Sequence, residues 1–383
     1  MAFDFDTVID RRDSDSSKWT EHGDQDIVPM PVADMDFVSP PEVLQALHER
    51  IDHGIFGYPD PTESLQKTVV AMLQRDHDWT VDPSWIVWLP GLVVGLNLFT
   101  RLHPDDAKQA TVTPIYPPFL LAPANTGRRL LKVPLRPAAE NYAMDMAALE
   151  AAFSQPDCHG FLLSNPHNPS GRVYTRDELD ALATLAIKHD VLVCSDEIHC
   201  GLILDDTLRH IPLATLSPAI AERTVTLMAP SKTFNLAGLQ CAFAIIPNAK
   251  LRMRYKRAAR GIVTEISVMG MAACEAAYTH GEPWRRELVA YLRQNRDAVQ
   301  QCVASLPGVS CHTIEATYLA WLDCRQSGIA NPYQHLLDHG LALSDGRHFG
   351  DPGFVRLNFG CPRSTLEAGL KRLRHAFEGN TTA

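Results

Sequence analysis

Lys232 lies in a short polar turn, Ser231-Lys232-Thr233, that follows the apolar stretch 225–228. A lysine at the end of a buried strand can be partly removed from water. Desolvation lowers the pKa of the amine and makes it a nucleophile that can form a Schiff base with a carbonyl group. A lysine taken at random is more often an exposed loop residue. Here the flanking residues, which extend from Ser231 to Leu239, favour a role for Lys232 as a Schiff-base nucleophile.

Asp196 ends a second apolar stretch, 191–195, and Asn168 follows a third, 160–164. A buried carboxylate can hold a protonated pyridine nitrogen, which is what pyridoxal 5'-phosphate (PLP) requires to act as an electron sink. The amide of Asn168 can donate a hydrogen bond to the phenolate oxygen of the same ring. Taken alone, Asp196 is as readily a helix cap or a surface turn, and Asn168 more readily an Asn-Pro turn.

Three further features fit a phosphorylated, planar ligand that carries a carboxylate. Gly91 follows an apolar strand and precedes a helix, so the backbone N–H groups of Gly91, Leu92 and Val93 can hold a phosphate. Tyr116 can stack on a flat ring, although such an aromatic is more often part of a core or rim. Arg356 lies inside the apolar run 354–359 and therefore needs an anionic partner. That partner is either a substrate carboxylate or an internal Asp or Glu.

Strand-like and helix-like segments alternate through the middle of the chain, which indicates a mostly parallel sheet covered by helices. The polar residues above follow the ends of strands, where open α/β sheets bind their ligands. The pattern changes after about residue 285, where a long helix, 284–306, leads into separated strands and a last helix, 365–377. This change indicates a smaller α+β domain.

The composition excludes several classes of function. Of the 383 residues, 35 are Lys or Arg and 45 are Asp or Glu, which gives a net charge of −10 and argues against nucleic-acid and anionic-membrane partners. The chain starts with an acidic stretch unlike a secretory signal, and no run is long and apolar enough for a membrane span. Nine cysteines without CxxC spacing indicate free thiols and a cytoplasmic location, and we expect no metal.

The order Gly91, Tyr116, Asn168, Asp196, Lys232 and Arg356 resembles that of fold-type I PLP enzymes, the aspartate aminotransferase superfamily, over nearly the whole chain. Four strings resemble the cystathionine β-lyase-type C–S lyases of bacteria: 3–12, 32–37, 195–199 and 231–239. The resemblance implies a three-layer α/β/α PLP-transferase fold with a mostly parallel central sheet. It also implies a large PLP-binding domain, 46–284, and a small α+β domain formed by segments 1–45 and 285–383.

The resemblance further implies how the cofactor is held. Lys232 carries PLP through a Schiff base and then moves the Cα proton of the substrate. Asp196 binds the pyridine nitrogen, and Asn168 lies on the side of the ring hydroxyl. Tyr116 stacks on the ring and borders the substrate. His199 takes the place where many aminotransferases have a tyrosine that touches the ring hydroxyl.

The remaining expected roles concern the phosphate, the substrate and a second subunit. The backbone at 91–93 and Ser231 bind the phosphate. Tyr58 matches a tyrosine that reaches the phosphate of the neighbouring subunit, which implies a homodimer with shared active sites. Arg356 binds the α-carboxylate of a small amino-acid substrate, helped by the backbone of Ala33.

Two positions depart from related patterns. Gln240 stands where many superfamily members have an arginine for the phosphate, which slightly favours the lyase branch. Pro31 stands where that branch usually has a tryptophan, so the substrate pocket is expected to differ. The leading hypothesis is β-elimination from cystathionine or another S-substituted cysteine, giving a thiol, pyruvate and ammonia. The alternatives are transamination, a β/γ-elimination or cyclisation of another amino acid, and a binding protein that kept the fold.

Overall fold

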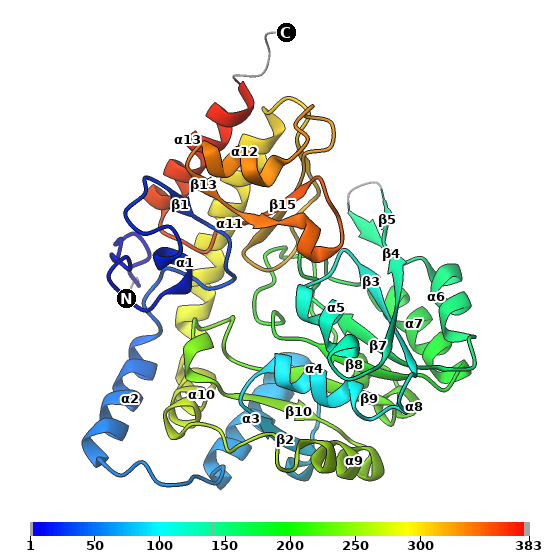
Figure 1. Cartoon of the computed structure of the whole chain (residues 1–383). Coiled ribbons are helices and arrows are strands. Elements are labelled where there is room, and N and C mark those ends of the chain that lie inside the picture. The colour runs from blue at the N-terminus through cyan, green and yellow to red at the C-terminus, as the bar shows by residue number, and fades with distance from the viewer. Residues whose placement is uncertain (1–2, 139–140, 379–383) are drawn as a thin grey trace.

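The computed structural model describes residues 3–138 and 141–378. Its larger part is built on a central sheet (Figure 1). The strands of this sheet are β2 (Ile86–Leu89), β3 (Lys108–Thr113), β4 (Arg129–Pro134), β7 (Cys158–Ser164), β8 (Leu192–Asp196), β9 (Thr224–Met228) and β10 (Ala242–Ile245). Among the described residues they lie in the order β2-β10-β9-β8-β7-β3-β4. Only β10 runs antiparallel to its neighbours β2 and β9, as far as the described residues show.

Helices cover both faces of the central sheet. One face carries α4 (Leu92–Thr100), α5 (Pro117–Ala124) and α9 (Ala249–Ala259). The other carries α6 (Met146–Phe153), α7 (Arg176–Lys188), α8 (Pro218–Ala221), α3 (Glu63–His77) and α10 (Val268–His280). Val193 and Cys194, neighbours in β8, pack into the cores on opposite faces, as the two-residue period of a strand requires. The expected three-layer α/β/α architecture is therefore confirmed.

Local sequence signals explain where the covering helices begin and end. Thr175 and Glu178 form the expected capping box at the start of α7, where each side chain bonds the other residue's backbone N–H. The helix α2 (Pro41–His53) begins at a proline, whose missing N–H is not needed there. It ends at Gly54, whose φ of 74° lies in the left-handed region that glycine adopts without strain.

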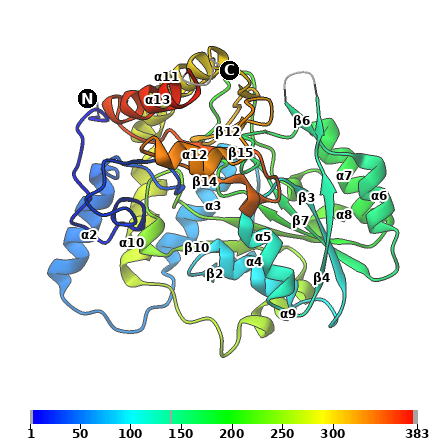
Figure 2. The same ribbon diagram turned by 45° about the horizontal axis from the view of Figure 1, so that its top comes forward.

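A smaller antiparallel sheet lies above the central sheet in Figure 1 and comes forward in Figure 2. Its strands are β11 (Ser310–Cys311), β12 (Leu319–Asp323), β15 (Phe354–Asn358) and β14 (Ser344–Asp345). The helices α11 (Glu282–Ala304), α12 (Pro332–Asp338) and α13 (Arg363–Glu378) belong to the same part of the chain. A short hairpin, β5 (Arg136–Pro137) with β6 (Tyr142–Ala143), projects beside the central sheet.

The N-terminal segment joins this smaller part. The strand β1 (Val28–Pro29) pairs in parallel with β13 (Leu341–Ala342), and the short helix α1 (Ser17–Thr20) precedes it. The backbone N–H of Asn358 in β15 also donates to the carbonyl of Met30. The N-terminal segment and the C-terminal part of the chain thus lie side by side, and α2 leads from the N-terminal segment to the larger part (Figure 1). Within the described ranges, no helix is both long and apolar enough to cross a membrane.

Candidate active site

A cavity of about 310 Å³ lies at the carboxyl ends of the parallel strands. The strand register places these ends together, because Ser164 pairs with Asp196 and Asp196 pairs with Leu227. Predicted site residues from across the sequence line the cavity: Ala33, Gly91, Leu92, Val93, Tyr116, Asn168, Asp196, His199, Ser231 and Lys232. The sheet edge that the sequence indicated is therefore where these side chains gather.

Lys232 extends from the turn after β9, and its Nζ donates a hydrogen bond of 2.6 Å to the carbonyl oxygen of Ala33. Burial, together with the positive charge of Arg356, lowers the pKa of the Lys232 amine to about 8. Asp34 and Asp196 act in the opposite direction. The amine consequently has a substantial neutral fraction near pH 8, which is the form that attacks a carbonyl group.

Asp196 is the last residue of β8, and it is buried. Its Oδ1 accepts a hydrogen bond of 3.1 Å from the backbone N–H of Ile198. Burial raises the pKa of the Asp196 carboxyl to about 7, and the hydrogen bond from Ile198 and the charge of Lys232 oppose this rise. A carboxylate in this setting is stabilised by a cation in the cavity, such as a protonated pyridine nitrogen.

Arg356 lies in β15 and is only 4% exposed. Its guanidinium donates to Asn168 Oδ1 at 2.9 Å, to the Pro31 carbonyl at 2.9 Å and to Ser344 Oγ at 3.2 Å, and it lies over the ring of Phe349. No carboxylate of the described chain lies within ion-pair distance, so the alternative of an internal Asp or Glu partner is wrong. Its Nε is buried without a partner. Burial lowers the pKa of Arg356 to about 10.

Asn168 is oriented by this contact. Because its Oδ1 accepts from Arg356, its amide nitrogen is the group left to donate toward the cavity. His199 lies on the same cavity, and its Nδ1 is buried without a hydrogen-bond partner. Burial, together with the charges of Lys232 and Arg356, holds the pKa of His199 well below its usual range. His199 is therefore neutral and has a polar atom available to a ligand.

The proposed phosphate end of the cavity is the N-terminus of α4. Gly91 is the capping residue of this helix, and Leu92 and Val93 begin it, so their N–H groups have no partner within the helix. A Cβ added to Gly91 would meet no atom within 4 Å, which leaves room for a ligand close to the backbone. Ser231 also lines the cavity.

Tyr58 does not belong to the cavity of its own chain. It lies in the link between α2 and α3, and 99% of its surface is exposed. Ile55 and Phe56 in the same link are also exposed. The structure therefore leaves Tyr58 apart from the predicted residues that line the cavity and from Arg356, which contacts one of them, Asn168.

Comparison with known proteins supplies the family. Residues 25–373 match the family described as aminotransferase class I and II. The chain belongs to this family. It is 38% identical to cystathionine β-lyase PatB of Bacillus subtilis, over 97% of this chain and 99% of that protein.

Two solved structures are similar to the chain over nearly its full length. A protein called OvoB has a TM-score of 0.96 and 43% identity, and the match covers 100% of both chains. Cystalysin from Treponema denticola, which contains PLP, has a TM-score of 0.95 and 30% identity over 99% of this chain and 100% of its own. These comparisons confirm the predicted resemblance to PLP-dependent C–S lyases and the predicted fold.

Several residues that shape the site were missed by sequence reasoning. Tyr318 donates to the Ala33 carbonyl at 3.0 Å, and Asn235 bonds both the N–H and the carbonyl of Met35. Asn358 donates to backbone carbonyls of the same N-terminal segment. Their partners are backbone atoms, which leave no trace in the side-chain pattern, so no spacing rule could have found these contacts.

Proposed function

We propose that the protein is a PLP-dependent C–S lyase that eliminates a thiol from an S-substituted cysteine such as L-cystathionine. The observation that carries this proposal is the arrangement of Lys232, Asp196 and Arg356. A nucleophilic amine and a buried carboxylate share one cavity, next to a buried guanidinium that lacks an anion. Relatives at up to 38% identity over the full length bear the name cystathionine β-lyase.

The residues present fit PLP. The N–H groups at the start of α4 and the Ser231 hydroxyl suit its phosphate, and Asp196 suits a protonated pyridine nitrogen. The unpartnered Nδ1 of His199 and the amide nitrogen of Asn168 suit the ring hydroxyl side. When bound, PLP supplies an electron sink for the pair left behind when the Cα proton is removed.

The side chains of this protein then have separate tasks. Lys232 would hold the cofactor covalently until a substrate amine takes its place, and in its neutral form it would take the Cα proton. Arg356 would bind the α-carboxylate through charge-assisted hydrogen bonds and so orient the Cα–H bond toward Lys232. A thiolate leaves Cβ with its electron pair, and hydrolysis of the remaining three-carbon fragment yields pyruvate and ammonia.

We also propose that the active enzyme is a homodimer located in the cytoplasm. Ile51 near the end of α2, together with Ile55, Phe56 and Tyr58 on the α2–α3 link, forms an exposed apolar stretch, which a second copy would cover. Tyr58 would then reach the phosphate end of the neighbour's cavity. All nine cysteines are free thiols, which agrees with a reducing compartment.

Transamination, or an elimination or cyclisation of another amino acid, is the second candidate, and Pro31 favours it. The carbonyl of Pro31 accepts hydrogen bonds from both Arg356 and Ser344, so position 31 borders the carboxylate site. A proline here, in place of the tryptophan usual in the lyase branch, leaves more space beside the substrate. In that case Lys232 would still move the proton, but no thiolate would leave Cβ of the substrate.

The first test is a spectrum of the purified protein, followed by addition of L-cystathionine. We expect an absorption band near the edge of the visible range, and release of equal amounts of pyruvate and free thiol. The band without pyruvate would move the assignment to the second candidate, and amino acids would then be tried with and without a keto-acid acceptor. Absence of the band would favour a binding protein that kept the fold.

A further inference from the structure

The segment 31–36 borders the cavity and is held mainly through its backbone. Side chains from distant parts of the chain bond successive peptide groups of this segment: Arg356 and Ser344 at Pro31, Asn358 at Val32 and Asp34, Lys232 and Tyr318 at Ala33, and Asn235 at Met35. The Ala33 carbonyl, which accepts from Lys232 Nζ, lies in the middle of this segment. Its position therefore depends on how the whole segment is anchored.

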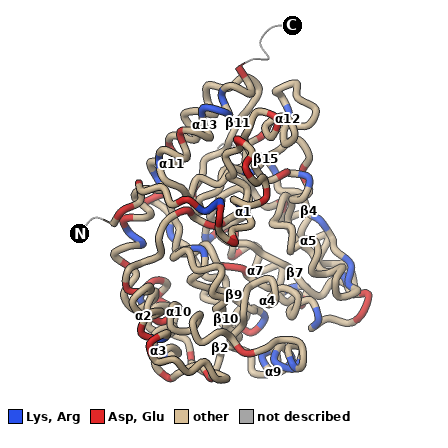
Figure 3. The backbone as a smooth tube through the Cα atoms, turned by 60° about the vertical axis from the view of Figure 1, so that its left-hand side comes forward, with Lys and Arg blue, Asp and Glu red and all other residues tan. Residues whose placement is uncertain are grey.

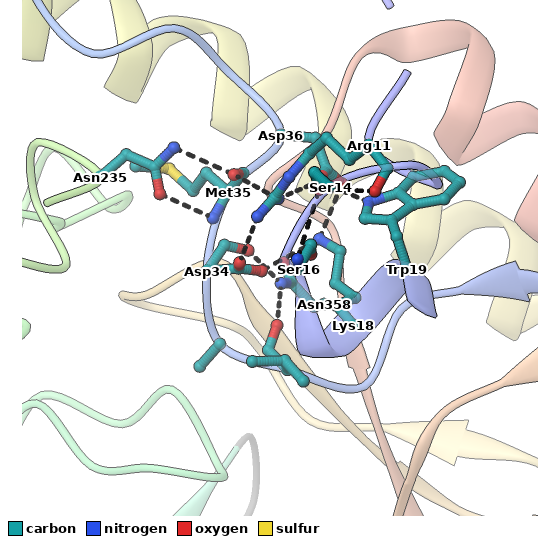
Figure 4. Close-up of polar contacts among 12 residues, drawn as sticks. Arg11, Ser14, Ser16, Lys18, Trp19, Asp34, Met35, Asp36, Asn235 and Asn358 are labelled. Carbon is teal, nitrogen blue, oxygen red and sulfur yellow. Dashed lines mark hydrogen bonds and ion pairs between the residues drawn. The ribbon is translucent and has the colours of Figure 1, made fainter. Parts of the chain in front are cut away.

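A cluster of opposite charges anchors the end of this segment (Figure 4). Lys18 Nζ lies 2.7 Å from Asp36 Oδ2 and 3.2 Å from Asp34 Oδ1. Arg11 donates to Asp36 at 2.7 Å and to Asp34 at 3.0 Å. The indole N–H of Trp19 donates to Asp36 at 2.9 Å. Both carboxylates are thus shared between two cations that come from the N-terminal arm, residues 11–19.

Lys18 is buried more deeply than is usual for a lysine. The Lys18 side chain is only 2% exposed, and that of Asp36 only 5%. In the view coloured by charge, basic and acidic segments meet beside α1 (Figure 3). Removing ions from water costs more than their attraction commonly returns, so a buried ion pair is weak evidence for stability but can specify one geometry. The geometry specified here is that of the residues directly after Ala33.

We propose that Lys18 and Arg11 are positioning residues of the active site, which place the Ala33 carbonyl against the Lys232 amine by binding Asp34 and Asp36. The path is continuous and short: Lys18 and Arg11 hold the two carboxylates, Asp34 follows Ala33 directly, and the Ala33 carbonyl holds Lys232. The N-terminal arm is accordingly part of the catalytic apparatus, although none of residues 11–19 lines the cavity.

The charges around Lys232 predict the direction of the effect. Asp34 and Asp196 favour its protonated form, whereas Arg356 disfavours it, and neutral His199 adds no charge. Loss of Lys18 removes a cation that compensates Asp34 and loosens the Ala33 carbonyl. The less compensated carboxylates then hold the proton on Lys232 more firmly.

The test measures Lys232 in the full-length protein after its cofactor has been removed. Formaldehyde with cyanoborohydride methylates neutral amines, and peptide mass spectrometry reports the modification of Lys232 across a pH series. For Lys18→Met we expect the pH of half-modification to rise by about one unit. Lys18→Arg should restore it in part. No substrate enters this measurement, so it does not depend on the proposed reaction.

Arg12→Met is the matched control. Arg12 comes from the same arm, but its side chain is 65% exposed, and among the residues that the structure describes it forms its ion pair with Asp10 at the surface. This variant should leave the Lys232 profile unchanged. After PLP is restored, Lys18→Met should lower kcat several-fold more than it raises KM, because Lys232 moves the proton and does not bind the carboxylate.

A folded Lys18→Met protein with the wild-type Lys232 profile and the wild-type kcat would overturn the proposal. Should Lys18→Met fail to fold, Arg11→Gln serves for the same measurement, because Arg11 is 25% exposed and its loss leaves Lys18 in place. An unchanged profile for Arg11→Gln beside an unchanged kcat would overturn the proposal equally.

Discussion

The amine of Lys232 lies 2.6 Å from the carbonyl oxygen of Ala33, which is 199 positions earlier in the chain. Tyr318, from the smaller sheet region, donates to the same oxygen at 3.0 Å. One backbone carbonyl therefore joins the turn after β9, the N-terminal segment and the C-terminal part. The lysine that we propose as the catalytic residue is held by a contact between segments that only the fold brings together.

Lys232→Ala should reduce turnover by more than about 10³-fold, because the enzyme loses its nucleophile and its proton carrier together. The visible absorption band should disappear, while circular dichroism and the melting temperature stay close to those of the wild type. Lys188→Ala is the control, since that lysine is exposed and pairs with Glu150 on the surface. Full activity in Lys232→Ala would contradict the assignment.

Arg356→Lys should raise KM by about 10- to 100-fold, because a single ammonium cannot replace the two-pronged hydrogen bonds of a guanidinium to the substrate carboxylate. The effect on kcat should be smaller. Steady-state kinetics with the physiological amino acid, compared with its amide, separates the two contributions. If the substitution raised KM for the amide as much as for the amino acid, Arg356 would not bind the carboxylate.

The buried carboxyl of Asp196 makes the cofactor-free protein sensitive to pH. Its pKa is raised from 3.8 to about 7, so the folded state holds a proton that the unfolded state releases between these values. The contribution of Asp196 to stability is therefore complete below about pH 4 and is lost as the pH rises through 7, by about 1.4 kcal/mol per unit of pKa difference at most.

Asp196→Asn should remove this dependence. In the cofactor-free state, the melting temperature of the wild type should fall relative to that of the variant between pH 5 and pH 8. Thermal unfolding at both values measures the change, and addition of PLP should reduce it for the wild type by supplying a cation to the carboxylate. A difference between the two proteins that stays constant with pH would contradict the burial effect.

Tyr58 provides the test of the shared site. Tyr58→Ala should bind PLP more weakly, and Lys232→Ala should be inactive on its own. Mixing the two under conditions that exchange subunits should restore activity, because each hybrid dimer contains one cavity with both an intact Lys232 and the partner's intact tyrosine. Light scattering should report a dimer. No recovery in hybrids of confirmed composition would argue that each chain is complete by itself.

The sequence by itself determined the cofactor chemistry and the location of the site in the fold. Lys232, Asp196 and Asn168 each follow an apolar stretch, and parallel strands place such ends at one edge because their directions are the same. The alternation of apolar segments predicted a mostly parallel sheet covered by helices, and the resemblance of the motif strings predicted the family and its three layers. These features are local in the chain, so residue types and spacing are enough to reveal them.

Only the tertiary structure decided which partners the charged residues have. It showed that Arg356 binds Asn168, Pro31 and Ser344 instead of an acid, and that buried Lys18 holds Asp34 and Asp36. Such contacts join residues far apart in the chain and often end on backbone oxygens. Every residue carries a backbone oxygen, so nothing in the order of side chains marks the one that will be used.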